Sequence, residues 1–161
     1  MLRRTYFIPL VAALLATTAA SAPAHVKWPP WLSIESPVNP WDASMNGAIL
    51  LVHAATHAGP PTVADMSGSA EGIVSGARRT IALKLDATSQ PGVFAVRRQW
   101  PTEGTWLLRI SLLSTTAIVS LDGAGRVTGV NIPTTLAEGR PIPRAVVARD
   151  IDSTLLVASA H

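Results

Sequence analysis

The side chains with the most distinctive chemistry in this sequence are histidines. His53 and His57 are the first and last residues of the segment HAATH. Their spacing is that of the HExxH zinc-protease motif, but Ala54 stands where that motif has its glutamate general base, which excludes the usual metalloprotease mechanism. On a strand the two histidines would share a face about 13 Å apart, too far to ligate one metal ion. Chelation by both therefore requires a helical turn or a bend near Ala55. The alternative is two partly buried or rim histidines.

The amino-terminal segment has the three parts of a secretory signal peptide. Arg3 and Arg4 supply a basic start, residues 7–20 form an apolar stretch, and the small residues 21–24 form an A-x-A cleavage site. We therefore predict a signal peptide over residues 1–24 and an exported protein, periplasmic or secreted. The apolar stretch is shorter than a bilayer span and no later segment is both long and free of charge, so we expect no transmembrane anchor after cleavage.

Cleavage after Ala24 would make His25 the first residue of the mature chain. Its α-amino group and imidazole would then offer two nitrogen donors, which suit Cu(II) in a tetragonal arrangement. Copper carriers and copper monooxygenases that begin with histidine use this chemistry. The sequence thus supports a copper-binding hypothesis in which His25 and either His53 or His57 are the candidate metal ligands. The alternative is that histidine stands at this position by chance.

The charge balance argues against a nucleic-acid partner. The chain has 13 basic and 10 acidic residues, but two of the basic residues belong to the predicted signal peptide. A nearly neutral mature chain lacks the clustered basic surface that neutralises phosphates. The chain also has no cysteine, so disulfides, thiolate metal sites and a lipid-modified cysteine are excluded. The residues that follow the leader are enough for one domain with a single core.

The central part of the chain predicts short strands separated by turn residues. The predicted strands cover residues 48–56, 71–74, 80–86, 93–100, 105–113, 116–121 and 126–132. In the strand over 105–113, Trp106, Leu108, Ile110 and Leu112 recur with period two, which indicates one buried face. Pro91-Gly92 fits a type II turn. About seven such strands predict an all-β fold, an immunoglobulin-like antiparallel β-sandwich, over residues 46–133.

Two flanking segments differ from the predicted sandwich. Residues 25–45 are rich in proline and tryptophan and predict an extended lead-in with an edge strand over 31–35. We expect its tryptophans, Trp28, Trp31 and Trp41, to pack on the sheet, with an exposed sugar-binding or partner-binding platform as the alternative.

Residues 134–161 predict a linker followed by a short C-terminal helix within residues 145–160. Ile151, Leu155 and Leu156 give that helix an apolar side. We expect it to dock on the sandwich, with contact to another protein as the alternative.

Four segments share their order with a known protein family. They are residues 46–52 (NGAILLV), 70–74 (AEGIV), 91–96 (PGVFAV) and 103–108 (EGTWLL). A strand opened by Pro-Gly and an aromatic residue, followed by Gly-x-Trp, resembles the YtkA-like domains of exported bacterial proteins. The resemblance covers about Ser44 to Leu113 and implies an immunoglobulin-like sandwich of largely unassigned function. The wider group of similar folds includes a periplasmic copper carrier, but no functional residues carry over to this chain.

The motifs of common enzymes are missing from the sequence. There is no GxSxG nucleophile elbow, no cysteine nucleophile and no GxxxxGK[ST] or GxGxxG phosphate loop. We therefore expect a non-enzymatic exported protein that binds a partner protein or small ligand in the bacterial envelope, with no cofactor unless copper is bound. The first alternative is the copper-binding periplasmic protein described above. A weaker alternative is a small hydrolase, which would need a cleft that holds His53 or His57 beside a serine or carboxylate.

Overall fold

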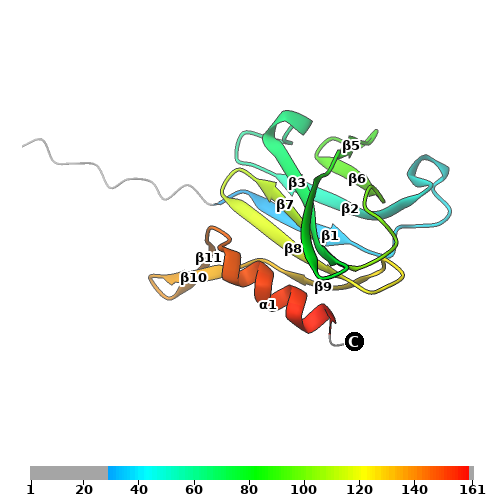
Figure 1. Ribbon diagram of the computed structural model, residues 1–161. Coiled ribbons are helices and arrows are strands. Elements are labelled where there is room, and N and C mark those ends of the chain that lie inside the picture. The colour runs from blue at the N-terminus through cyan, green and yellow to red at the C-terminus, as the bar shows by residue number, and fades with distance from the viewer. Residues whose placement is uncertain (1–28, 160–161) are drawn as a thin grey trace, which may run out of the picture.

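The computed structural model describes residues 29–159 of the chain (Figure 1). The predicted signal peptide, His25 and Trp28 lie outside the described residues. No helix of the described part is long and apolar enough to cross a membrane.

Most of the described elements are strands. They are β1 (Trp31–Glu35), β2 (Ala48–Ala55), β3 (Met66–Val74), β4 (Ala77–Ala82), β5 (Asp86–Ala87), β6 (Val93–Arg97), β7 (Thr105–Leu112), β8 (Thr115–Leu121), β9 (Val127–Asn131), β10 (Thr134–Ala137) and β11 (Arg140–Pro143). The helical elements are the short 3-10 helices η1 (Ala43–Met45) and η2 (Val63–Asp65) and the helix α1 (Ala148–Ser159).

The strands of residues 29–159 form two antiparallel sheets that pack face to face and one separate hairpin (Figure 1). One sheet has the order β1-β2-β6-β5, and the other has the order β4-β3-β7-β8-β9. If the strands from β1 to β8 are lettered A, B, C, C′, D, E, F and G, these orders are A-B-E-D and C′-C-F-G, the arrangement of an immunoglobulin-like fold, with β9 added at one edge. The predicted all-β sandwich with a short C-terminal helix is therefore confirmed.

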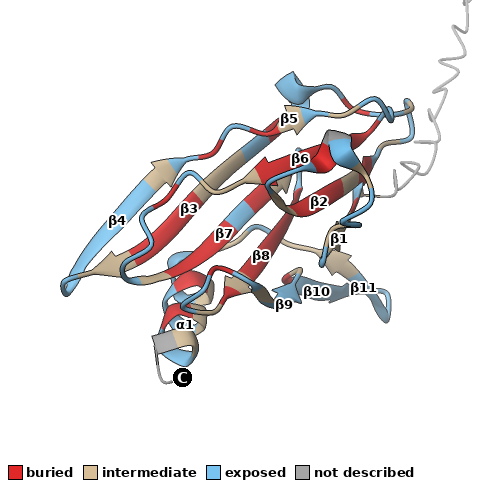
Figure 2. Ribbon diagram, turned by 90° about the vertical axis from the view of Figure 1, so that its right-hand side faces the viewer, coloured by how far each residue is buried: buried red, intermediate tan, exposed pale blue. Residues whose placement is uncertain are grey.

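The core lies between the two sheets and is built from the inward residues of each strand (Figure 2). Leu108 and Ile110 of β7 face Val52 of β2 and Phe94 of β6 across it, and all four side chains are buried. Trp106 lies over Gly72 of the neighbouring strand, where a Cβ would stand 2.5 Å from the indole ring. The period-two pattern predicted for β7 thus marks the core correctly.

The predicted strand over 80–86 is wrong, because it joins two elements in different sheets. β4 ends at Ala82 at the edge of one sheet, and β5 begins at Asp86 at the edge of the other. Leu83 and Leu85 lie in the crossing and are both buried in the core. Gly68 gives them room, since a Cβ there would stand 3.1 Å from Leu85 and 3.2 Å from Leu83. Leu83 and Leu85 flank the exposed Lys84, so their alternation with it comes from burial at a crossover and not from a continuous strand.

The turn at Pro91-Gly92 agrees with the sequence. Gly92 has a φ of 77°, and the Val93 amide donates to the Gln90 carbonyl at 3.1 Å, as a type II turn requires. The predicted edge strand over 31–35 is also confirmed, because β1 pairs with β2 on one side and forms the end of its sheet.

The carboxyl-terminal part contains a hairpin that the sequence did not predict and the helix that it did predict. The segment expected to be a linker contains the β10–β11 hairpin, whose turn residues Glu138 and Gly139 both have positive φ, as in a type I′ turn. The helix forms as predicted and docks on the five-stranded sheet, with Ile151 and Leu155 buried.

Candidate functional site

The outer face of the four-stranded sheet holds the first candidate residue, His53 of β2. Its Nε2 lies 2.7 Å from Oε2 of Glu35 on β1, and both side chains are half-buried. Ser33 is the residue opposite His53 in the register, so Glu35 reaches the imidazole from the diagonal position. The imidazole Nε2 thus donates to the Glu35 carboxylate on the same face.

His57 lies beyond the end of β2 and is exposed. Thr56 and Gly59 exchange two backbone hydrogen bonds of 3.1 Å around it, so His57 stands in a turn. The chain therefore bends after Ala55, but His53 remains inside the strand. Within residues 29–159, no three histidine, cysteine or acidic side chains come together in a group that could hold a metal ion.

The described chain begins at the same end of the sheet as His57. Pro29 and Pro30 precede Trp31, whose register partner is Ala55. The Pro30 carbonyl accepts a hydrogen bond of 2.6 Å from the Thr115 hydroxyl, which ties this end of β1 to the opposite sheet. The third candidate, His25, lies outside the described residues.

The expectation that the tryptophans pack on the sheet is wrong for two of them. The side chain of Trp31 is 56% exposed on β1, and that of Trp41 is 91% exposed in the connection from β1 to β2. Trp31 shares the outward side of β1 with Glu35, because alternate strand residues point the same way. We call the group Trp31, Glu35 and His53 the tryptophan face.

Beside the tryptophan face, the same outer surface is covered. Met45 of η1 is buried and packs with Leu51, Val93 and Ala95, which point outward from β2 and β6. The connection from β1 to β2 thus folds back over one part of the sheet and leaves the part at β1 open.

The outer face of the five-stranded sheet is covered at one end by α1. Leu107 of β7 and Ile118 of β8 point outward and are buried beneath Ile151 and Leu155. Because these outward residues are apolar, the helix has a surface on which to dock.

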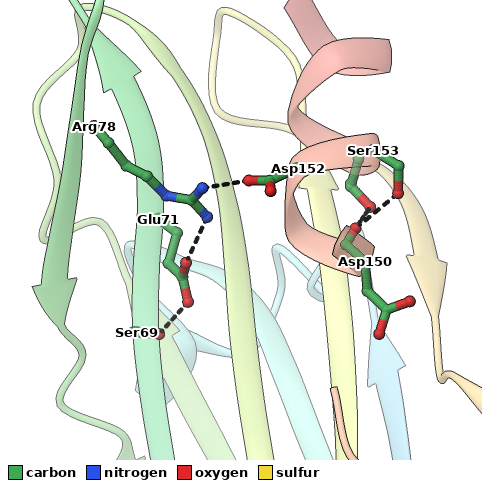
Figure 3. A network of polar contacts seen from close by, with 7 residues as sticks. Ser69, Glu71, Arg78, Asp150, Asp152 and Ser153 are labelled. Carbon is green, nitrogen blue, oxygen red and sulfur yellow. Dashed lines mark hydrogen bonds and ion pairs between the residues drawn. The ribbon is translucent and has the colours of Figure 1, made fainter. Parts of the chain in front are cut away.

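A polar network joins the helix to the sheet at this end (Figure 3). Arg78 of β4 donates to Asp152 of α1 and, at 3.3 Å, to Glu71 of β3, whose side chain is nearly buried. Hydrogen bonding to Asp152, with a smaller contribution from Glu71, raises the pKa of Arg78 above its usual value. The helix is therefore held by apolar packing and by an ion-pair bridge.

The first turn of α1 has its own ion pair. Arg144 binds both carboxylate oxygens of Asp150 at 2.7 Å, and the Val147 amide donates to the same carboxylate at 2.9 Å. The Arg144 guanidinium, followed by the Val147 amide, lowers the pKa of Asp150 from 3.8 to about 2. Asp150 thus caps the helix and anchors the chain that leads into it.

The other end of this outer face is open and polar. Its outward residues are Ser67 and Ser69 of β3, Arg109 and Ser111 of β7, and Thr116 of β8. We call this set the arginine groove. It lines a hollow of about 400 Å³, walled by Leu113 and Ser114 at one end and by Pro143, Ala145 and Val146. A second hollow of about 250 Å³ shares Ser67, Arg109 and Ser111 with the first and extends to Ser69.

Sequence reasoning missed this groove, although a signal for it exists. The strand pattern assigned Trp106, Leu108, Ile110 and Leu112 to the core, which leaves Leu107 and Arg109 outward. An apolar residue on an otherwise wet face marks a covered site, and an arginine two residues later marks where that cover ends.

Comparison with protein-family models, with curated proteins and with solved structures yields no significant match to this chain.

Proposed function

We propose that this protein is an exported, non-enzymatic immunoglobulin-like domain that binds a partner protein in the bacterial envelope through the tryptophan face. The observation that carries the proposal is the 56% exposure of Trp31 on an edge strand. Burial of a tryptophan side chain is strongly favourable, and tryptophan is enriched among the residues that contribute most to protein interfaces. A partner seated on β1 would bury this surface.

The contact between His53 and Glu35 suits the border of such an interface. Both side chains are half-buried and hydrogen-bonded to each other, so a partner can cover them without leaving either polar group unpaired. The predicted signal peptide supports export, and the four segments that resemble YtkA-like domains support an envelope protein of that kind. The strand order is compatible with this resemblance.

Site-specific photocross-linking in the producing bacterium tests the proposal. A photoreactive phenylalanine analogue in place of Trp31 should give one discrete adduct of higher mass. The matched control is the same analogue at Leu156, which is 68% exposed on α1, the helix that packs on the opposite outer face of the sandwich. Absence of an adduct at position 31, or the same adducts at both positions, would contradict the proposal.

Copper binding is a second candidate, favoured by the position at which the chain enters the fold. β1 starts beside the end of β2 that leads to His57, and Pro29 follows His25 by four positions, a reach of at most about 14 Å. A site of this kind would join the α-amino group and imidazole of His25 to the imidazole of His57.

Titration of the exported protein with Cu(II) tests this candidate, after its amino-terminal residue has been determined. His25→Ala and His57→Ala should each weaken binding, and His53→Ala serves as control because its imidazole binds Glu35. Identical titrations for wild type and His25→Ala would end the copper hypothesis.

A further inference from the structure

We infer that the arginine groove is a binding site for a small hydroxylated monocarboxylate such as a sugar acid. It lies on the outer face of the five-stranded sheet, on the opposite side of the sandwich from the tryptophan face. Ligand binding in the arginine groove can therefore be tested independently of partner binding at the tryptophan face.

Arg109 lies at the centre of the five-stranded sheet. β7 is the middle strand of its sheet, and the register places Ser69 of β3 on one side of Arg109 and Ile118 of β8 on the other. Arg109 thus projects from the middle of the sheet, two residues from the helix-covered Leu107, and its exposed side chain lines both hollows. A side chain in this place can approach a ligand that rests on the sheet.

No acidic side chain among the described residues neutralises the positive charge of Arg109. Arg78, Arg97, Arg126 and Arg144 each bind an aspartate or glutamate, whereas Arg109 has no ion pair or hydrogen bond among the described residues. Glu71, the acidic residue on the same face of β3, binds Arg78 and lies 3.4 Å from the Ser69 hydroxyl. No acidic side chain lines the two hollows. The groove therefore carries one positive charge that the protein does not neutralise.

Serine and threonine hydroxyl groups line the groove beside Arg109. Ser111 and Thr116 bind each other at 2.8 Å, and Ser67 lies beside Ser111 in the register. A hydroxyl both donates and accepts, so a row of them matches the hydroxyls of a polyol. The guanidinium offers a planar fork of donors that fits the two oxygens of a carboxylate.

Charge and size select the ligand class. One uncompensated cation balances one negative charge, which favours a carboxylate over a phosphate dianion. The hollow of about 400 Å³ is within the range of small-molecule sites and holds a single sugar ring. Its open, hydroxyl-lined shape predicts a weak complex, with a dissociation constant in the millimolar range.

A titration followed by ¹H–¹⁵N NMR tests the inference, with D-glucuronate as probe. We expect shifts centred on the amides of Ser67, Ser69, Arg109, Ser111 and Thr116. D-glucose at the same ionic strength should leave these signals in place, and inorganic phosphate should bind more weakly than glucuronate.

Arg109→Gln should weaken glucuronate binding about tenfold or more, because it removes a charge-assisted pair of hydrogen bonds. Arg109→Lys, which keeps the charge but loses the fork, should fall between wild type and Arg109→Gln. The matched control is Arg140→Gln, an exposed arginine of the β10–β11 hairpin, which should bind as wild type does. Equal binding by Arg109→Gln and wild type, equal shifts with glucose, or tighter binding of phosphate would overturn the assignment.

Discussion

The two outer faces of the sandwich have the same plan: one part is covered and the other is open. On the four-stranded sheet the cover is the connection from β1 to β2, which places Met45 on Leu51. On the five-stranded sheet the cover is α1, which places Leu155 on Leu107 and Ile118. In both cases the sequence marks the covered part by apolar residues on a face that would otherwise be wet.

The open parts differ in their charges. On the tryptophan face His53 and Glu35 satisfy each other beside a large exposed ring, whereas in the arginine groove Arg109 has no partner among the described residues. A satisfied pair beside an aromatic surface suits a macromolecular interface, and an unsatisfied cation in a hollow suits a small anion. The covered parts should therefore control stability, and the open parts should control binding.

Removal of the helix contact should give the largest effect. Leu155 is 2% exposed, so Leu155→Ala should lower the free energy of unfolding by about 2 to 5 kcal/mol through lost burial and a cavity. The neighbouring Leu156 is 68% exposed, and Leu156→Ala should change the free energy of unfolding by less than about 0.5 kcal/mol. Urea denaturation measures both, and equal losses for the two variants would mean that α1 does not dock through Leu155.

The cover of the other sheet should contribute less. Met45 is buried against Leu51, Val93 and Ala95, and Met45→Ala should lower the free energy of unfolding by about 2 kcal/mol, near the lower end for buried methionine. The same denaturation experiment ranks the two covers. A larger loss for Met45→Ala than for Leu155→Ala would reverse the comparison.

The polar bridge beneath the helix should rank third. Arg78→Ala leaves the nearly buried Glu71 carboxylate without its ion-pair partner, at a cost of about 1 kcal/mol, since the arginine itself is partly exposed. Arg79 is adjacent on β4, exposed and without an ion pair among the described residues, so Arg79→Ala is the matched control and should be neutral. A neutral Arg78→Ala variant would show that apolar packing alone holds the helix.

The pH dependence that Asp150 gives to stability should appear only in acid. Because the folded-state pKa of Asp150 is about 2, below its usual value of 3.8, its contribution is complete above about pH 4 and is lost as the pH falls toward 2. Asp150→Asn should therefore flatten the fall of Tm between about pH 4 and pH 2. In an NMR titration, Arg144→Gln should raise the pKa of Asp150 more than Arg149→Gln does, because Arg144 binds the carboxylate directly. Equal shifts for these two variants would contradict the stated cause.

The sequence predicts the sandwich well where burial follows the strand period, as in β7. It fails at the crossing from β4 to β5, because Leu83 and Leu85 alternate as strand residues do while they fill the core between sheets. It also fails at Trp31, because a tryptophan on an edge strand has no sequence mark that separates a buried ring from an exposed one. Arg109 is missed for a related reason: its lack of a carboxylate partner depends on three neighbouring strands and on where the helix ends.

The most direct test of the binding role is the yield of the photocross-link at position 31 when the neighbouring hydrogen-bonded pair of His53 and Glu35 is altered. Glu35→Gln removes the carboxylate that His53 binds but should leave Tm nearly unchanged, because both side chains are half-buried at the surface. We predict a clear fall in the yield of the position-31 adduct in this variant. An unchanged yield from a protein of unchanged Tm would contradict the assignment of Trp31, Glu35 and His53 to one interface.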